Sequence, residues 1–295
     1  MSLLPSATEI VCALGLGERL VGISHSCDYP VEVLDRPRLS RPRTNLDGLS
    51  GREIDAVIRA VLRDHGSVYE IDVAGIAAVA PDLVITQGIC DVCAVPESQV
   101  VQTLADLPSK PDVLTLDSHD LAAIFAGIRA LGRAAGVVPL AEACVAAIER
   151  RIMTIRARVA GRPRPRVLAL EWLDPPYVPG HWVPEMVEAA GGDLVAGVAH
   201  RPSYRVEWAH LVSSAPDIVL VMPCGFDRPG AEREAATHRA RLEPFGCPVY
   251  VLDASAYFSR SGPRVANGVE ILAALLHPEL APGYIPLITK TLTGC

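Results

Sequence analysis

The chain has 295 residues, of which 50% are hydrophobic and 21% charged, and this composition is typical of a globular protein that buries a sizeable core. A formal net charge of -7 and a pI near 5.6 argue against nucleic acid as a partner, because no basic stripe is left for a phosphate backbone. No apolar run reaches the roughly 18 to 20 residues that span a bilayer, so the sequence predicts no membrane span.

The first residues bear on cellular location and on cysteine chemistry. No Lys or Arg precedes the first apolar stretch, as it would in a secretory signal peptide. We therefore expect a cytoplasmic protein, or a periplasmic one if the true start lies upstream of Met1. In the cytoplasm the eight cysteines are expected to be reduced thiols, which can bind metal, rather than disulfides.

The first part of the chain predicts alternating helices and strands. Pro5 and Ser6 begin a helix that is ended by Gly15 and Gly17. A continuous apolar run at 83–86 indicates a strand buried on both faces, as in a parallel sheet. The helices expected here are 5–15 and 71–79, and the strands are 3–4, 19–24, 83–86 and 113–116.

The middle of the chain predicts a long connector. Residues 120–160 contain no strand signal, and their apolar positions recur at three-to-four spacing with a break around 136–139. The Pro-rich segment 162–165 ends this helical region. We therefore expect an N-terminal lobe at 1–118, connector helices at 119–161 and a C-terminal lobe at 162–295.

The last part of the chain repeats the alternation of strands and helices. Strands alternating with helices predict an α/β fold with parallel sheets. The strands expected here are 166–170, 194–198, 218–222 and 249–252, and the helices are 183–190, 206–214 and 264–276.

An ordered internal repeat supports two lobes. Ala80–Ile85 is echoed by Ala215–Leu220, and a pair of segments beginning at Glu9 and Glu185 recurs in the same order. Ala-Pro-Asp is also a common junction between a helix and a buried strand. Duplication is the interpretation that we favour, because two separate segments recur.

The opening residues also resemble a known family. Pro5–Ile10, followed by 13–17 and 20–24, is similar to the start of cobalamin and iron-siderophore solute-binding proteins that serve ABC importers. The resemblance covers nearly the whole chain. It implies two Rossmann-like lobes with parallel sheets joined by a long connector helix, with limited closure on a ligand held in the cleft between the lobes.

Other motifs depart from exported members of that family. The segments 24–30, 90–93, 171–176 and 222–227 resemble a cytosolic, cobalamin-binding branch. The resemblance implies a small-molecule ligand, cobalamin or another corrinoid, and an ABC permease as partner only if the protein is exported. We expect a monomer.

Four cysteines follow predicted strands, where ligands sit in open parallel sheets. They are Cys27, Cys90, Cys93 and Cys224. Four thiolates suit zinc or an iron-sulfur cluster, because soft sulfur donors select those metals. Unligated thiols in the cleft are an equal alternative. The remaining cysteines are interpreted as small structural residues: Cys12, Cys144, Cys247 and Cys295.

Aromatic residues cluster in two loops of the C-terminal lobe. Trp172 and Trp182 bracket a Pro-rich loop after strand 166–170, and Tyr257 and Phe258 follow strand 249–252. Large rigid rings could form the walls around a flat macrocycle such as a corrin. The alternative is that these rings belong to the core at the ends of the sheet.

Five polar residues are candidates for the cleft: His25, Glu171, Asp174, His181 and Arg260. A histidine there could ligate cobalt or donate a hydrogen bond to the corrin periphery, although a loop histidine is more often simply hydrogen-bonded.

The sequence favours a binding protein over an enzyme. It contains no nucleophile elbow, P-loop, dinucleotide fingerprint or zinc-protease motif. Asp28, Glu171 and Asp227 could act as acids or bases, yet carboxylates at strand ends more often cap helices. We expect a non-catalytic binder of a corrinoid or related metal chelate. A cysteine-ligated iron-sulfur or zinc protein and a metal-dependent enzyme are the alternatives.

Overall fold

In this computed structural model the described residues are 1–46, 48–88, 97–105, 107–280 and 289–290. The chain divides into two compact units, Met1–Ser118 with Ala122–Val145, and His119–Leu121 with Ala146–Cys295. Helix α6 (Val138–Val159) runs from one unit into the other. Its 22 residues correspond to a length of about 33 Å. The two-lobed α/β fold class is confirmed.

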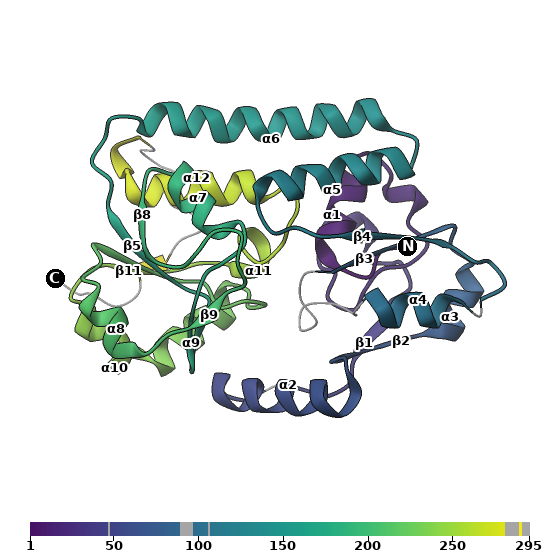
Figure 1. Cartoon of the computed structure of the whole chain (residues 1–295), viewed down its shortest axis with the longest axis horizontal. Helices are drawn as coiled ribbons and strands as arrows, with labels where there is room; N and C mark the ends of the chain where they lie inside the picture. Colours follow the sequence, from purple (N-terminus) through teal and green to yellow (C-terminus); the bar gives the residue numbers. More distant parts are fainter. Residues whose placement is uncertain (47, 89–96, 106, 281–288, 291–295) are drawn as a thin grey trace. The chain divides into compact units, whose positions relative to one another are not determined.

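The first unit contains a parallel pair of strands, β3 and β4, and an antiparallel pair, β1 and β2. Figure 1 shows α1 and α5 on one side of β3 and β4, with α3 and α4 on the other. The helices are α1 (Pro5–Ala13), α2 (Gly51–His65), α3 (Val73–Val79), α4 (Glu97–Ala105) and α5 (Leu121–Ala134), with 3-10 turns η1 (Gly17–Arg19) and η2 (Val31–Val33). The strands are β1 (Ser40–Pro42), β2 (Tyr69–Ile71), β3 (Leu83–Gln87) and β4 (Asp112–Leu116).

Two strands expected near the N-terminus are wrong as predicted. The chain start pairs with β3 through Met1–Leu3 rather than through Leu3 and Leu4, because the Leu3 N–H donates to the Ile85 carbonyl at 2.9 Å. The segment 19–24 forms only one parallel bridge, between Ile23 and Arg38. Pro37 has no N–H to extend that ladder in one direction. In the other direction the ladder ends at Leu39, because its carbonyl accepts a hydrogen bond from Asp72 N–H.

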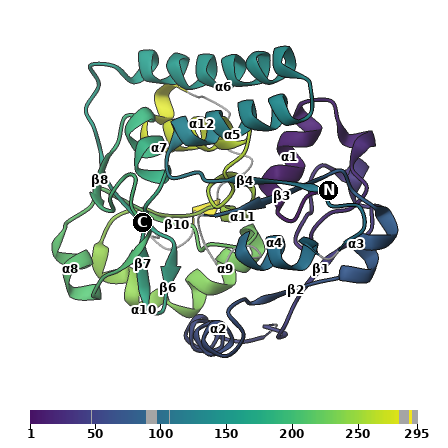
Figure 2. The same ribbon diagram turned by 45° about the vertical axis from the view of Figure 1, so that its right-hand side comes forward.

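Helix α2 was not predicted. It connects β1 to β2. In Figures 1 and 2 it lies on the far side of these two strands from β3 and β4. Ser50 and Glu53 form a capping box at its start, and Gly66 ends it in the left-handed conformation. Its apolar residues recur at helical spacing, but none of these side chains is fully buried.

The second unit is built on a five-stranded sheet in the described part of the chain, with the order β12-β11-β10-β5-β8 and only β12 antiparallel. A small sheet of β6, β7 and β9 stands beside it. The strands are β5 (Arg166–Leu170), β6 (Trp172–Leu173), β7 (Pro176–Val178), β8 (Asp193–Ala196), β9 (Tyr204–Arg205), β10 (Ile218–Val221), β11 (Val249–Val251) and β12 (Thr289–Lys290). The helices are α7 (Val183–Ala189), α8 (Trp208–Ser213), α9 (Arg228–Thr237), α10 (Arg239–Leu242), α11 (Ala254–Tyr257) and α12 (Val265–Leu276), with 3-10 turns η3 (Glu243–Phe245) and η4 (Pro278–Leu280).

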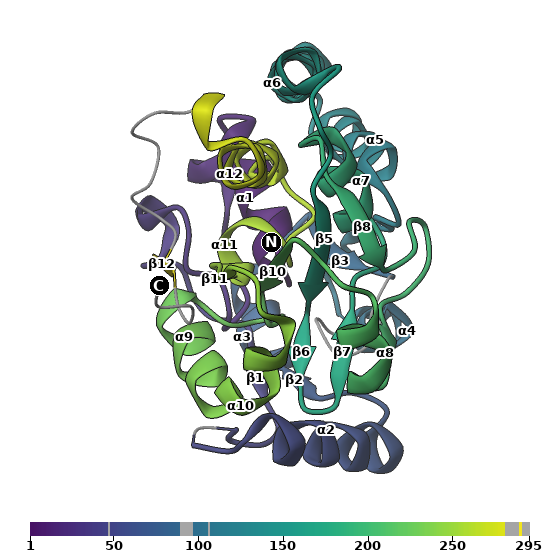
Figure 3. The same ribbon diagram turned by 90° about the vertical axis from the view of Figure 1, so that its left-hand side faces the viewer.

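Helices cover both faces of this sheet, which explains its continuous apolar strands. Leu168, Leu170 and their neighbours on β10 and β11 pack against α8, α9 and α10. Val167 points to the opposite face, where Gly192 lets Val187 of α7 and Leu276 of α12 approach closely. Figure 3 shows α7 and α12 above the strands and α8, α9 and α10 below them.

Candidate functional site

Three loops of the second unit meet at the carboxyl edge of its sheet. Because β5, β10 and β11 are parallel neighbours, the segments that follow them leave the sheet at one edge. Backbone hydrogen bonds join these loops. Cys224 N–H donates to the Glu171 carbonyl at 2.9 Å, and Ser255 N–H donates to the Phe226 carbonyl at 3.0 Å. The site candidates of this unit therefore lie on one connected platform.

Trp172 is a large ring of this platform and is half-buried. Its Nε1–H donates to the Asp174 carbonyl at 3.1 Å, and its ring meets Phe226 edge-on with 5.5 Å between ring centres. Trp182 and Phe258 differ, since they are only 7% and 2% exposed and are joined by a 3.0 Å bond from Trp182 Nε1–H to the Phe258 carbonyl. These two buried residues join the loops that follow β5 and β11.

Glu171, Tyr257 and Arg260 lie on the same unit. Ser203 Oγ donates to Glu171 Oε2 across the small sheet. Tyr257 is half-buried, with the guanidinium of Arg264 5.6 Å from its ring centre. Arg260 lies in the segment directly after α11 and is half-buried.

His181 occupies a tightly built corner. Its backbone is left-handed, with φ 51°, and its N–H donates to the Arg201 carbonyl at 2.7 Å. A side chain at the preceding Gly180 would place its Cβ 2.0 Å from that same carbonyl oxygen, so only glycine fits there. The corner therefore fixes the direction of the His181 backbone.

In the first unit the candidate is His25, in the loop after the Ile23 bridge. Its Nδ1 lies 3.0 Å from Ser40 Oγ, and its ring centre is 4.8 Å from that of Tyr69. Arg38 Nη1 donates to three carbonyls of the loop, including that of His25 at 2.7 Å. Burial and the Arg38 charge lower the pKa of His25, so its imidazole is neutral near pH 7.

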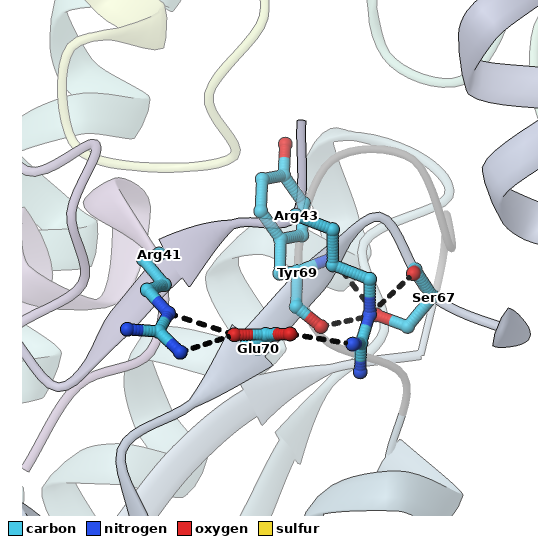
Figure 4. Close-up of polar contacts among 5 residues, drawn as sticks. All are labelled: Arg41, Arg43, Ser67, Tyr69 and Glu70. Carbon is cyan, nitrogen blue, oxygen red and sulfur yellow. Dashed lines mark hydrogen bonds and ion pairs between the residues drawn. The ribbon is translucent and has the colours of Figure 1, made fainter. Parts of the chain in front are cut away.

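The antiparallel pair of β1 and β2 holds Tyr69 in place. Glu70, the next residue along β2, accepts from Arg41 at 2.7 Å and from Arg43 at 2.8 Å, while Arg43 Nε–H also donates to the Ser67 carbonyl (Figure 4). Arg41 and Glu70 face each other in the antiparallel register. These two arginines brace the strand on which Tyr69 contacts His25.

The structure describes two of the four predicted metal-binding cysteines. Cys27 is 1% exposed in the first unit and lies 3.1 Å from Thr8 Oγ1 and 3.3 Å from Ser24 Oγ, whereas Cys224 is exposed in the second unit. Cys90 and Cys93 lie outside the described residues. Among the residues that are described, no three His, Cys, Asp or Glu side chains gather to hold a metal ion. The four-cysteine site and the shared cleft both stay predictions.

Three cysteines that the sequence assigned to structural roles have unreactive environments. Burial raises the pKa of the Cys12 thiol to about 11 and also raises the pKa of Cys144 and Cys247. A thiol with a raised pKa is a poor nucleophile and a poor metal ligand near neutral pH.

Sequence reasoning missed Tyr69, Phe226 and His119. Tyr69 and Phe226 directly contact predicted site residues, and the ring of His119 lies 5.9 Å from that of His181. Phe226 could have been found, because it follows a predicted strand by the same rule that selected Trp172. His119 could have been found in the same way, because it follows the predicted strand 113–116, whereas Tyr69 follows no strand expected from the sequence.

Comparison with protein families matches the model described as "Periplasmic binding protein" to residues 1–241. Over 95% of its length the chain is 23% identical to an uncharacterized ABC transporter substrate-binding lipoprotein, YvrC, of Bacillus subtilis, covering 80% of that protein. A stretch of 59 residues is 39% identical to the vitamin B12-binding protein of Vibrio cholerae, covering 20% of this chain and 21% of that protein.

Solved structures show the same fold. A periplasmic heme-binding protein from Pseudomonas aeruginosa matches with a TM-score of 0.74 at 22% identity, over 99% of this chain and 98% of that one. The periplasmic vitamin B12-binding protein BtuF of Vibrio cholerae matches with a TM-score of 0.66 at 20% identity, over 95% and 96%. In the described part of this chain no helix is both long enough and apolar enough to cross a membrane.

Proposed function

We propose that this chain, which belongs to the periplasmic binding protein family, binds a flat metal-containing macrocycle, a corrinoid such as cobalamin or a related chelate, without chemical turnover. Relatives and neighbours named for vitamin B12 or heme binding support this ligand class.

The observation that carries the proposal is the aromatic platform of the second unit. Trp172 is held by one hydrogen bond and one edge-on ring, and it stands on loops that are cross-linked by backbone hydrogen bonds. A half-buried ring that is already fixed loses little conformational entropy when a flat ligand stacks on it. The hydrogen bond between the buried residues Trp182 and Phe258 adds rigidity to the same loops.

His25 of the first unit is a separate candidate for a ligand contact. His25 is neutral, and its Nδ1 is engaged with Ser40, which leaves Nε2 as the nitrogen suited to a metal centre or to a hydrogen bond with the ligand periphery. Neutral imidazole is the form that binds metals, because protonation removes the lone pair.

Binding is tested by titrating the purified protein with hydroxocobalamin and, separately, with hemin. We expect a change in the visible spectrum of one of them and a higher Tm. A ligand at 100 times its Kd stabilises the protein by about 2.7 kcal/mol. Unchanged spectra and unchanged Tm with both ligands would remove the proposal.

A matched pair of variants locates the site. Trp172→Leu is expected to weaken binding about tenfold or more, because one stacking face is lost. Trp208→Leu is the control, since Trp208 is also a half-buried tryptophan beside one phenylalanine, Phe245, which precedes β11 at the opposite edge of the sheet. Equal losses in both variants would point to general destabilisation rather than to a contact with the ligand.

An ABC permease is the partner that the relatives' descriptions suggest. Cytoplasmic location stays a prediction. Fractionation of cells that produce the untagged natural protein would decide whether it can meet such a permease at the outer face of the membrane.

A further inference from the structure

A short segment of the second unit, His119–Leu121, is held at each of its three residues. Leu121 N–H donates to Glu185 Oε2 at 2.8 Å, and Asp120 Oδ2 lies 2.9 Å from His200 Nδ1. The ring of His119 lies beside that of His181, with 5.9 Å between their centres and 33° between their planes. These contacts fix His119 against a loop 62 residues further along the chain.

The partners of this segment are themselves fixed by an uncommon backbone. His181 and His200 have φ of 51° and 61°, and His200 N–H donates to the His181 carbonyl at 3.2 Å. A left-handed backbone is uncommon for a residue with a side chain, and it is retained where the surrounding structure enforces it, frequently at binding sites.

From this geometry we propose that His119 and His181 bind one divalent transition-metal ion, such as Co²⁺, Ni²⁺ or Zn²⁺, with water at the remaining coordination positions. A metal bonded to an imidazole nitrogen lies about 2.0–2.1 Å from it and therefore about 3.2 Å from the ring centre. Two imidazoles on one ion can thus have centres up to about 6.4 Å apart. The 5.9 Å separation of His119 and His181 falls within that range.

Charge and access at the two histidines also suit a cation. Asp120 follows His119 directly, and Glu185 accepts a hydrogen bond from Leu121, so two carboxylates lie on or bond to the segment that carries His119. His119 is exposed, so a hydrated ion can reach it. Two protein ligands leave coordination positions open, unlike the closed four-ligand sites of structural zinc.

This inference does not depend on corrinoid binding or on the predicted cysteine site. A proton shared between the two rings, or ring packing alone, would produce the same contact without any metal. Metal titration separates these cases, because only metal binding by the two histidines gives a stoichiometric complex of the ion with the protein.

The test uses the full-length protein stripped with a chelator and titrated with CoCl₂ and ZnCl₂ at pH 7.5, with no cobalamin or heme present. We expect one ion per chain by calorimetry and visible Co²⁺ absorption bands. His119→Asn and His181→Asn should each weaken binding at least tenfold, and the double variant should bind more weakly than either single variant. The two effects should not add, because both histidines bind one ion. Asparagine is chosen because it tolerates the left-handed backbone at position 181.

Two controls make the result specific. His210→Asn changes an exposed histidine on α8 of the same unit and should leave affinity unchanged. Cys90→Ser combined with Cys93→Ser should also leave it unchanged, because the ion is assigned to imidazoles. Binding that survives His119→Asn, or that disappears with the cysteines alone, would overturn the assignment, and so would the absence of any stoichiometric ion from a correctly folded wild-type protein.

Discussion

At the scale of single residues, the environment of His25 illustrates how burial sets chemistry. The imidazole is half-buried between Ser40 and Tyr69, and the Arg38 guanidinium lies against the carbonyls of the same loop. Both burial and the neighbouring positive charge disfavour the protonated ring. The sequence could nominate His25 as a loop histidine, but it could not reveal Arg38, which reaches back from 13 residues further along the chain.

The lowered pKa of His25 gives a prediction about pH. Between that pKa and the ordinary value of about 6.5, the unfolded chain binds more protons than the folded one, so stability falls as pH decreases through this window. His25→Gln should reduce the loss of Tm between pH 7 and pH 5, measured by scanning calorimetry. His65→Gln, an exposed histidine on the last turn of α2, should leave the loss as in wild type. A steeper loss in His25→Gln would contradict the assignment.

At the scale of elements, carboxylates at strand ends cap helices in this fold. Asp227 accepts from Gly230 N–H at 2.8 Å at the start of α9, and Asp72 and Asp253 do the same for α3 and α11. A helix start leaves N–H groups without partners, and a side-chain oxygen at the cap satisfies one of them. Asp227, a candidate acid or base from sequence, therefore has a sufficient structural role.

Substitution distinguishes a cap from a reactive carboxylate at Asp227. Asp227→Ala should lower the free energy of unfolding by about 1 kcal/mol, whereas Asp227→Asn should change it little, because asparagine is an equally good cap. Urea denaturation measures both variants. An Asn variant as unstable as the Ala variant would mean that the negative charge, rather than the cap hydrogen bond, is what the fold needs.

At the scale of the whole molecule, helix α6 begins in one unit and ends in the other. The unit boundary falls between Val145 and Ala146, in the interior of the helix. A helix interior carries an unbroken hydrogen-bond ladder, so the chain at this boundary lies within regular structure.

Proline in this helix tests the importance of that continuity. Ala146→Pro removes one hydrogen bond and clashes with the preceding turn, so it should cost about 3 kcal/mol or more, seen as a lower midpoint in urea. Val138→Pro is the control, because the first helical position does not use its N–H within the helix. Equal midpoints for Ala146→Pro and the wild type would show that the helix tolerates a break at the boundary.

The sequence by itself determined the alternation of strands and helices, the continuous buried strands and the family resemblance, because apolar periodicity, Pro and Gly are local signals. Only the tertiary structure decided which distant groups meet. Pro37 and Asp72 limit the ladder at Ile23 to one bridge. Trp172 is held by the ring of Phe226, which lies 54 residues further along the chain. The His119–His181 pair depends on the contacts that hold residues 119–121. Such contacts depend on how chain segments far apart in sequence pack together, and no pattern within one segment encodes them.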